Sequence, residues 1–237
     1  MTAETSLSIV VPVLNEATGI GGLLAALQPM RARGVEIVVV DGGSTDGTAD
    51  VARPLADVLI TAPRGRARQM NAGAAAARGS VLLFLHADTR LPDDADTFVL
   101  DAVAQKALAW GRFDVRIAGR SPWLKVIARM MNWRSRLTGI ATGDQAMFAT
   151  RRAFVGAGGF PDQALMEDIA LSTSLRRMVP PVCLKSTVAT SGRRWETRGV
   201  WRTILLMWTL RLRYFLGADP NRLAVASGYR PPCIDDR

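Results

Sequence analysis

SVLLFLHADTR, at residues 80–90, is the stretch that decides the predicted fold. Its consecutive apolar residues, 81–85, are too few to cross a membrane and are typical of a strand buried on both faces. The run ends abruptly at His86-Ala87-Asp88. A buried parallel strand presents such a carboxylate at the edge where open α/β sheets bind ligands. Asp88 could there hold Mg²⁺ or Mn²⁺, or it could only cap a helix that starts near Pro92.

Three further short apolar runs precede this stretch, with helical patterns between them. We expect strands at Leu7–Val13, 35–40 and 58–61, and helices at 20–27, 49–52 and 67–77. This alternation is typical of a Rossmann-like, mostly parallel central sheet flanked by helices. The sequence therefore predicts an α/β fold.

Beyond residue 90 the alternation loosens. Helices are expected at 93–106, 122–137, 165–178 and 200–216, and strands at 109–117, 145–149 and 182–189. The strand 109–117 alternates apolar and polar residues, which predicts one solvent-exposed face. The helix 200–216 is amphipathic, and the tail from Gly217 is expected to form a loop. No linker rich in Gly, Ser or Pro divides the chain, so a single domain over residues 1–237 is predicted.

Positive charge is concentrated in the C-terminal third of the chain. The net charge is +9, and residues 151–237 contribute 14 Lys/Arg against 7 Asp/Glu. Such a basic surface suits nucleic acid, anionic lipid or a phosphorylated small molecule. Cys183 and Cys233 have neither zinc-site nor disulfide-scaffold spacing, and no stretch of about 18 apolar residues occurs. Because the N-terminus lacks a basic leader with an apolar run, a cytoplasmic protein is predicted.

Polar clusters follow the expected ends of three buried strands, at Asn15-Glu16, Asp41-Gly42-Gly43-Ser44 and His86-Ala87-Asp88. In a doubly wound sheet these ends lie along one crevice. Asp41 can accept a hydrogen bond from a base N–H or a ribose hydroxyl. The arginines at 64, 66 and 68 stand at the N-terminal side of a helix, where free N–H groups and positive charge favour phosphate. Each cluster alone could be a tight turn or a solvated face, but their coincidence favours a ligand site.

These clusters belong to segments that resemble a known family. SIVVPVLNE, VVVDGGSTDGT, GRARQMNAGAAAARG and LLFLHADT, in this order and spacing, resemble the glycosyltransferase family 2 nucleotide-sugar transferases, which have the GT-A fold. The resemblance is close over residues 6–89 and thinner through Gly143-Asp144-Gln145 and Glu167-Asp168. The form GRARQMNAGA…LFLHADT, with the later GDQ, is similar to the radical-SAM/selenoprotein-domain-associated subfamily, also called the arsenosugar-biosynthesis type.

The resemblance implies a nucleotide-sugar donor, and a UDP-sugar first. Glu16 would lie near the ribose, Asp41 would read the base edge, and Arg66 would lie near the diphosphate. The implied donor site comprises Pro12, Asn15, Glu16, Asp41, Ser44, Arg64, Arg66, Asn71 and Ala87. Residues 6–90 would form the nucleotide-sugar-binding half, 91–190 the acceptor and catalytic half, and 191–237 a basic C-terminal helix and tail.

The resemblance also implies a divalent cation, Mn²⁺ or Mg²⁺, held by Asp88 and bridging the donor diphosphate. The usual Asp-x-Asp is altered here, because His86 stands in its first position and is either a second metal ligand or a structural residue. Asp168 would be the general base that takes the proton from an acceptor hydroxyl, with Glu167 as its neighbouring carboxylate. The alternative is that both acids only stabilise the first turn of a helix. Direct in-line attack would invert the anomeric carbon.

Two later clusters have implied roles beside the donor. Gly143-Asp144-Gln145 falls where the family places acceptor-side residues, although it could be only a tight turn. Arg193 and Arg194, before Trp195, resemble the Gln-x-x-Arg-Trp of processive members without its Gln. They could clamp the diphosphate or form a solvated turn. Single transfer is expected, because no membrane-spanning helix offers a channel for a polymer.

The acceptor is predicted only as a hydroxyl compound, either a small molecule or a lipid-linked one. The helices 122–137 and 200–216 carry Trp and Leu beside Arg. This pattern suits peripheral contact with the inner face of a membrane, ordinary core packing or a homodimer interface.

Three rival functions remain. A sugar nucleotidyltransferase normally has a Gly-rich basic loop after its first strand, where this chain has Leu14-Asn15-Glu16. A non-catalytic nucleotide-sugar-binding or membrane-associated scaffold would explain His86 as part of a degraded metal site. A nucleic-acid-binding module is disfavoured, because no nucleic-acid motif accompanies the charge. A metal-dependent glycosyltransferase is the function that the sequence favours.

Overall fold

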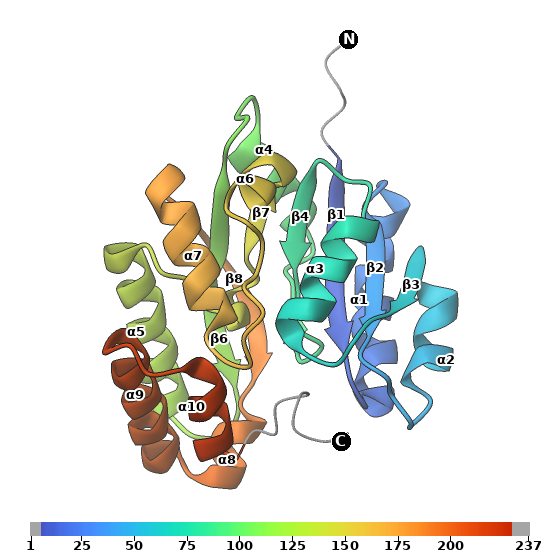
Figure 1. The fold of residues 1–237 in the computed structure, drawn as a ribbon. Coiled ribbons are helices and arrows are strands. Elements are labelled where there is room, and N and C mark those ends of the chain that lie inside the picture. Colours follow the sequence, from blue (N-terminus) through green and yellow to red (C-terminus); the bar gives the residue numbers. More distant parts are fainter. Residues whose placement is uncertain (1–5, 229–237) are drawn as a thin grey trace.

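The structure is a computed structural model that describes residues 6–228, apart from the side chains of Arg194 and Arg198. The described residues form one eight-stranded sheet in the order β3-β2-β1-β4-β7-β6-β8-β5 (Figure 1). The strands are β1 (Leu7–Val13), β2 (Glu36–Asp41), β3 (Val58–Thr61), β4 (Val81–Phe84), β5 (Thr89–Arg90), β6 (Trp110–Ala118), β7 (Phe148–Thr150) and β8 (Val182–Ser191).

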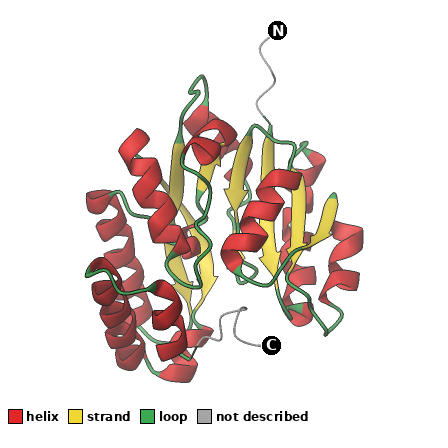
Figure 2. Ribbon diagram, viewed as in Figure 1, coloured by secondary structure: helices red, strands yellow, loops and turns green. Residues whose placement is uncertain are grey.

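Helices flank the sheet on both faces (Figure 2). The α-helices are α1 (Ala17–Ala32), α2 (Thr48–Ala52), α3 (Arg66–Ala76), α4 (Ala95–Val103), α5 (Trp123–Thr138), α6 (Arg151–Gly156), α7 (Glu167–Met178), α8 (Arg193–Arg198), α9 (Val200–Phe215) and α10 (Pro220–Ala226). Two short 3₁₀ helices are η1 (Arg53–Leu55) and η2 (Gly143–Gln145). The predicted α/β fold with a C-terminal amphipathic helix is confirmed.

The sheet changes character at β7. Strands β3, β2, β1 and β4 are parallel to one another, as the sequence predicts. Strand β7 is antiparallel to both β4 and β6, whereas β6 and β8 are parallel. The sheet is therefore mixed. A strand's apolar run says how deeply it is buried but not its direction, which explains why the sequence alone did not predict the reversal.

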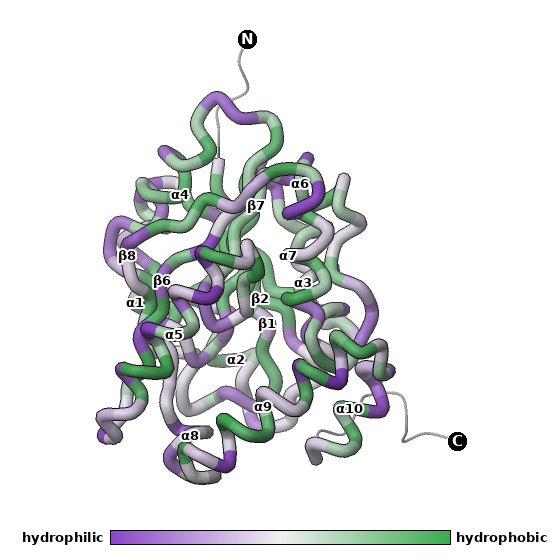
Figure 3. Tube along the Cα trace, turned by 90° about the vertical axis from the view of Figure 1, so that its left-hand side faces the viewer, coloured by the Kyte–Doolittle hydropathy of each residue, from purple (hydrophilic) through white to green (hydrophobic). Residues whose placement is uncertain are grey.

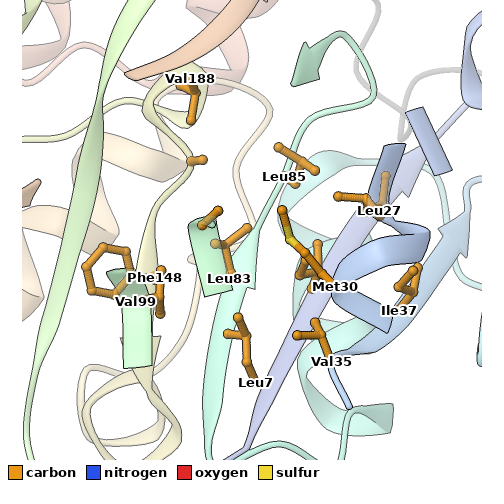
Figure 4. Close-up of a cluster of buried hydrophobic side chains, with 14 of the residues drawn as sticks. Leu7, Leu27, Met30, Val35, Ile37, Leu83, Leu85, Val99, Phe148 and Val188 are labelled. Carbon is orange, nitrogen blue, oxygen red and sulfur yellow. The ribbon is translucent and has the colours of Figure 1, made fainter. Parts of the chain in front are cut away.

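Two apolar layers sandwich the parallel half of the sheet. Helices α1 and α4 cover one face, and Figure 4 shows Leu83 of β4 with Met30, Val99 and Phe148 in that layer. Helices α3, α6 and α7 cover the other face. Helix α3 lies directly on the strands at Gly73, where a Cβ atom would come within 2.4 Å of Val10 Cγ1. This close packing fixes the N-terminal end of α3 above the ends of β1 and β2.

Three sequence expectations are wrong in detail. Strand β6 is not half exposed along its length, because its first half lies inside the sheet between β7 and β8 and is buried on both faces. The strand expected at 145–149 starts only at Phe148, since Gln145 belongs to η2. Asp88 does not cap a helix, because it is followed by β5 and the N-cap of α4 is Asp94.

The tail after Gly217 also differs from its prediction. Residues 220–226 form α10, in which the Asp219 side chain accepts a hydrogen bond from the Asn221 N–H and Pro220 takes the first helical position. Leu223 packs with Ile140 and Leu210 in a small apolar cluster. Pro231-Pro232 and Cys233 lie outside the described residues.

Candidate active site

The turns after β1 and β2 are joined by hydrogen bonds. The Asn15 N–H donates to Ser44 Oγ at 2.9 Å, and Asn15 Oδ1 accepts from the Thr45 N–H at 2.9 Å. Asn15 has a left-handed backbone with φ of 54°, a conformation that Asn tolerates better than most residues. The structure thus brings together the first two predicted clusters.

Asp41 lies at the end of β2, with its carboxylate bonded inside its own turn. The Ser44 N–H donates to both carboxylate oxygens, at 3.1 and 3.2 Å, and the Ser44 hydroxyl donates to the same carboxylate. The next residue but one, Gly43, has φ of +89°, which an L side chain rarely adopts. Asp41 is only 6% exposed, so its position is fixed before any ligand binds.

Gln69 of α3 is a site-supporting residue that the sequence reasoning missed. Its buried Nε2 donates to the carbonyls of Val13 at 2.8 Å and Val40 at 2.9 Å. Val13 and Val40 lie at the ends of β1 and β2, and the Val13 carbonyl also accepts from the Gly42 N–H at 2.9 Å. Gln69 therefore joins the two strand ends, and only its place within the GRARQMNAG segment could have indicated it.

A cavity of about 920 Å³ opens at this edge of the sheet. It lies between the ends of the parallel strands and the helices α5 and α9. The predicted site residues on its wall are Glu16, Ala87, Asp88, Asp144 and Arg193. We call the turns after β1, β2 and β4 the donor side of the site, and η2, α5, α9 and the start of α7 the acceptor side.

Two carboxylates lie close together on the donor side. Burial, followed by the charge of Asp88, raises the pKa of Glu16, while the charges of Arg193 and Arg66 act in the opposite direction. Within residues 6–228, no group of three or more His, Cys, Asp or Glu side chains is arranged to hold a metal ion. The oxygen donors of this pair fit a cation such as Mg²⁺ or Mn²⁺ only if a substrate supplies further ligands.

His86 is not on the cavity wall. Its side chain is 12% exposed and lies with Nδ1 3.8 Å from an Asp144 carboxylate oxygen. It packs directly on Gly143, where a Cβ atom would come within 2.2 Å of His86 Cε1. The structure thus gives His86 a contact that supports η2.

The acidic pair at the start of α7 is tied to the same turn. Asp168 accepts hydrogen bonds from the N–H groups of Gly143 and Ile169, each at 2.7 Å, which fix the orientation of its carboxylate. Glu167 is buried, and burial, followed by the charge of Asp168, raises its pKa to about 7. Asp168 therefore sits behind Gly143, next to the part of the wall formed by Asp144 and Arg134.

Several predicted site residues lie away from the cavity. The Gln145 side chain is fully buried, and its Nε2 donates to Ser135 Oγ at 3.1 Å. The Asn71 amide exchanges two hydrogen bonds with the Phe160 backbone, at 2.7 and 3.0 Å. Pro12 is buried within β1 beside Val40. These three residues do not line the cavity, and their contacts hold neighbouring parts of the protein in place.

The predicted arginines have different surroundings. Arg64 and Arg66 are exposed at the start of α3, whereas Arg68 forms an ion pair with Asp162 at 2.8 Å. Arg193 lines the cavity. The side chain of Arg194 lies outside the described part of the chain.

Arg134 of α5 and Arg211 of α9 also line the cavity. The sequence analysis did not predict either of them as a site residue. Burial, followed by the charge of Arg211, lowers the pKa of Arg134 to about 10, while Asp168 acts in the opposite direction. Both lie on helices for which the sequence analysis considered lipid contact, core packing or a dimer interface. Their convergence depends on the packing of α5 against α9, which a sequence pattern does not show.

The fold and the site define an α/β protein with a ligand cavity at the carboxyl ends of parallel strands. The family profile of glycosyl transferase family 2 matches residues 8–158, and the chain belongs to this family. The predicted family is thereby confirmed.

Curated relatives match mainly over the N-terminal part. The chain is 36% identical over 114 residues to the succinoglycan biosynthesis protein ExoA of Rhizobium meliloti (strain 1021), covering 44% of this chain and 34% of the relative. It is 38% identical over 102 residues to the PGL/p-HBAD biosynthesis glycosyltransferase of Mycobacterium bovis (strain BCG / Pasteur 1173P2), covering 40% of each. The chain thus matches well under half the length of these relatives.

Solved structures with a similar fold include S. aureus TarS 1-349 in complex with UDP-GlcNAc, with a TM-score of 0.64, 19% identity, and coverage of 79% of this chain and 58% of that one. The mannosyltransferase PcManGT from Pyrobaculum calidifontis, in complex with GDP-Man and Mn²⁺, has a TM-score of 0.63, 23% identity, and coverage of 98% and 67%. Glucosyl-3-phosphoglycerate synthase from Mycobacterium tuberculosis, with Mn²⁺ and UDP, has a TM-score of 0.59, 18% identity, and coverage of 79% and 71%. These likenesses confirm the predicted GT-A fold.

Proposed function

We propose that the chain transfers a sugar from a nucleotide-diphosphate donor, with a UDP-sugar as the first candidate, to an acceptor hydroxyl. The observation that carries this proposal is that Glu16, after β1, and Asp88, after β4, line one cavity, while the turn after β2 is hydrogen-bonded to the turn after β1. Membership of glycosyl transferase family 2 supports it. The UDP-GlcNAc, GDP-Man and UDP bound to structurally similar proteins also support a nucleotide donor.

On the donor side, Asp41 would accept a hydrogen bond from the base and Glu16 one from the ribose. Arg66 and Arg193 would attract the diphosphate, and both act electrostatically on Glu16 at the same place. Asn15 and Ser44 would hold the turns in position through their mutual hydrogen bond. This arrangement is preorganised, because the polar groups of the turns are already bonded before the donor arrives.

Asp88 would hold Mn²⁺ or Mg²⁺, with the donor diphosphate completing the ligand set. The proximity of Glu16 to Asp88 supports a cation there, because two neighbouring carboxylates repel each other when both are charged. A divalent cation at this place would neutralise charge that develops on the leaving diphosphate. We assign His86 a supporting role under Gly143 in place of the alternative role as a second ligand.

Asp168 would act as the general base. It would take the proton from the acceptor hydroxyl while the hydroxyl oxygen forms a bond to the anomeric carbon and the bond to the diphosphate breaks. In-line attack of this kind inverts the anomeric carbon. Asp144, which lines the cavity, is the neighbouring carboxylate that must be tested beside Asp168.

Calorimetric titration of UDP, GDP and UDP-sugars, with and without Mn²⁺, tests this proposal. We expect Mn²⁺-dependent binding of UDP that is lost in Asp88→Ala. Unchanged Mn²⁺ dependence in that variant would remove the metal assignment. Absence of nucleotide binding under every condition would favour the non-catalytic scaffold, and release of pyrophosphate from UTP and a sugar phosphate would favour the nucleotidyltransferase. The similarity to the radical-SAM-associated subfamily adds no substrate to this proposal.

The outer faces of α5 and α9 are a second element of the proposal. Large apolar side chains there are 46–67% exposed, among them Trp123, Trp201 and Leu205, which do not line the cavity, and Figure 3 shows the hydrophobic residues of α9 at the edge of the molecule. None of the described helices is long and apolar enough to span a membrane. Both helices carry Lys or Arg but no Asp or Glu.

We propose that this surface contacts an anionic membrane, because two copies of a purely basic face would repel each other in a homodimer. Co-sedimentation with vesicles tests it. We expect binding to phosphatidylglycerol vesicles that falls with salt and in the double variant Trp123→Ala/Trp201→Ala, whose side chains are exposed and do not line the cavity. A concentration-dependent dimer lost in the same variant would favour the homodimer.

A further inference from the structure

Arg134 and Arg211 have an unusual environment for buried cations. Nε and one terminal nitrogen of Arg134, and Nε of Arg211, are buried without a hydrogen-bond acceptor among the residues that the structure describes. Burying a charged donor without a partner is costly, so such atoms are rare in folded proteins. Both side chains nevertheless lie on the wall of the cavity.

Other arginines of the chain show what a structural role looks like. Arg136, only two residues from Arg134, donates to an Asp114 carboxylate oxygen at 2.7 Å. Arg151 donates to three backbone carbonyls, at 2.6–3.0 Å, and holds the end of α3 against β7. Arg134 and Arg211 have instead converged from two helices to a place where each feels the charge of the other.

Different neighbouring charges act most strongly on Glu16 of the donor side and on Arg134 of α5. The charges that act on Glu16 are those of Asp88, Arg193, Asp46 and Arg66. The charges that act on Arg134 are those of Arg211, Asp168 and Arg112. The pair therefore belongs to the acceptor side, beside the proposed base.

We infer that Arg134 and Arg211 bind a phosphate monoester carried by the acceptor, and that this contact directs the acceptor hydroxyl to Asp168. The inference rests on the proposed function. Two guanidinium groups match the nearly doubled negative charge of a phosphate monoester at neutral pH, and their planar donors suit its oxygens. Met130, Trp133 and Trp208 on the same wall would contact an apolar part of the acceptor.

Binding of phosphate to the full chain, measured by calorimetry in the presence of saturating UDP and Mg²⁺, tests this inference. We expect inorganic phosphate and phenyl phosphate to bind, and phenol not to bind. Arg134→Gln and Arg211→Gln should each weaken phosphate binding about tenfold or more, as expected for a lost hydrogen bond to a charged group. The matched controls, Arg129→Gln on α5 and Arg213→Gln on α9, replace exposed arginines of the same helices and should bind phosphate as the wild type does.

The melting temperature distinguishes a ligand-binding role of Arg134 and Arg211 from a structural role. Because the two arginines repel each other and bury N–H groups that have no acceptor among the described residues, either substitution should leave the melting temperature unchanged or raise it. A marked fall in melting temperature together with unchanged phosphate affinity would overturn the inference in favour of a structural role. Failure of the wild type to bind phosphate would overturn it as well.

UDP titration, run in parallel, keeps the two proposals distinguishable. If Arg134→Gln and Arg211→Gln lose UDP rather than phosphate, the pair belongs to the donor diphosphate and the acceptor assignment is wrong. If the wild type binds phosphate but no nucleotide, the proposed function fails, and with it the assignment of the phosphate to an acceptor. Neutral vesicles doped with a long-chain alkyl phosphate distinguish a lipid-borne phosphate from a soluble one, since only the former would recruit the chain through Arg134 and Arg211.

Discussion

The donor side and the acceptor side of the cavity are built in different ways. On the donor side, Asp41, Ser44 and Asn15 are joined by hydrogen bonds between turns, and Gln69 ties the two strand ends beneath them. On the acceptor side, Arg134 and Arg211 bring charge to the wall without described partners. The first arrangement is hydrogen-bonded before a ligand binds, whereas the second leaves buried N–H groups without acceptors among the described residues.

This difference indicates where specificity resides. The family profile ends at residue 158, so it includes the donor side together with α5 and η2 but excludes α7 and α9. A shared donor site combined with a separately built acceptor wall allows one fold to serve many acceptors. Substitutions on the donor side and on the acceptor side should therefore change different measurements.

The largest expected effect is a loss of sugar transfer without a change in donor binding. Asp168→Asn should lower the rate of UDP release from the UDP-sugar by about 10²–10⁴-fold, because an amide cannot take the proton of the acceptor hydroxyl. UDP affinity should not change, since Asp168 is bonded to the Gly143 turn and not to the donor turns. Steady-state rates and UDP titration on the same preparation measure both quantities.

Asp144→Asn is the matched control, because Asp144 is on the cavity wall beside the same turn. A much larger loss of transfer in Asp144→Asn than in Asp168→Asn would reassign the base to Asp144. Undiminished turnover in Asp168→Asn would remove Asp168 from the chemistry.

The free energy of unfolding should depend on pH through Glu167, which lies at the start of α7 on the acceptor side. Its pKa is raised from 4.5 to about 7 by burial and then by Asp168, so the folded chain binds a proton there that the unfolded chain has lost. This contribution to stability is complete below pH 4.5 and is lost as the pH rises through about 7. The loss is of the order of 3 kcal/mol, from about 1.4 kcal/mol per pKa unit.

Glu167→Gln should abolish this pH dependence, because the amide is neutral throughout. Urea unfolding at pH 5 and pH 8 measures the free energy of unfolding of both proteins. The stability of the wild type relative to the variant should fall between the two pH values. A constant difference would mean that Glu167 is already charged in the folded chain at pH 5.

A smaller effect is expected when the donor side is loosened. Gln69→Leu keeps most of the side-chain volume but removes the Nε2 donor from the carbonyls of Val13 and Val40, of which Val13 retains the hydrogen bond from the Gly42 N–H. The free energy of unfolding should fall by about 2 kcal/mol, within the range for buried polar groups left unsatisfied. UDP binding should weaken, while phosphate binding, measured without UDP, should not. Equal weakening of both ligands would show that the two sides are mechanically coupled.

The sequence predicted the donor side far better than the acceptor side. The strands Leu7–Val13 and Val58–Thr61 have the predicted bounds, and the clusters of Asn15 and Ser44 meet as expected. These features depend on local apolar runs and on strand ends that share one edge. The pairing of Arg134 with Arg211 depends on how α5 packs against α9, which no local pattern encodes.

The direction in which polar side chains point was the other feature that the sequence did not predict. The resemblance implied that Asn71 and Gln145 belong to the site and left His86 as either a metal ligand or a structural residue, and the described contacts of all three are with other parts of the protein. A sequence cannot show whether an amide or an imidazole turns toward a ligand or toward backbone. Gln69 was missed for the same reason.

The smallest effect is expected from two neighbouring arginines of α3. Arg68 is paired with Asp162 at the surface, so Arg68→Gln should change the free energy of unfolding by less than about 1 kcal/mol and leave UDP affinity unaltered. Arg66→Gln should leave stability equally unaffected but weaken UDP binding several-fold, because Arg66 acts on Glu16 at the donor side. Titration of UDP in 50 mM and 500 mM salt checks the electrostatic origin, since the difference between the two variants should shrink at about 500 mM as screening increases. If Arg68→Gln weakens UDP binding as much as Arg66→Gln does, the whole basic turn attracts the donor, and the donor side is less sharply preorganised than its hydrogen bonds indicate.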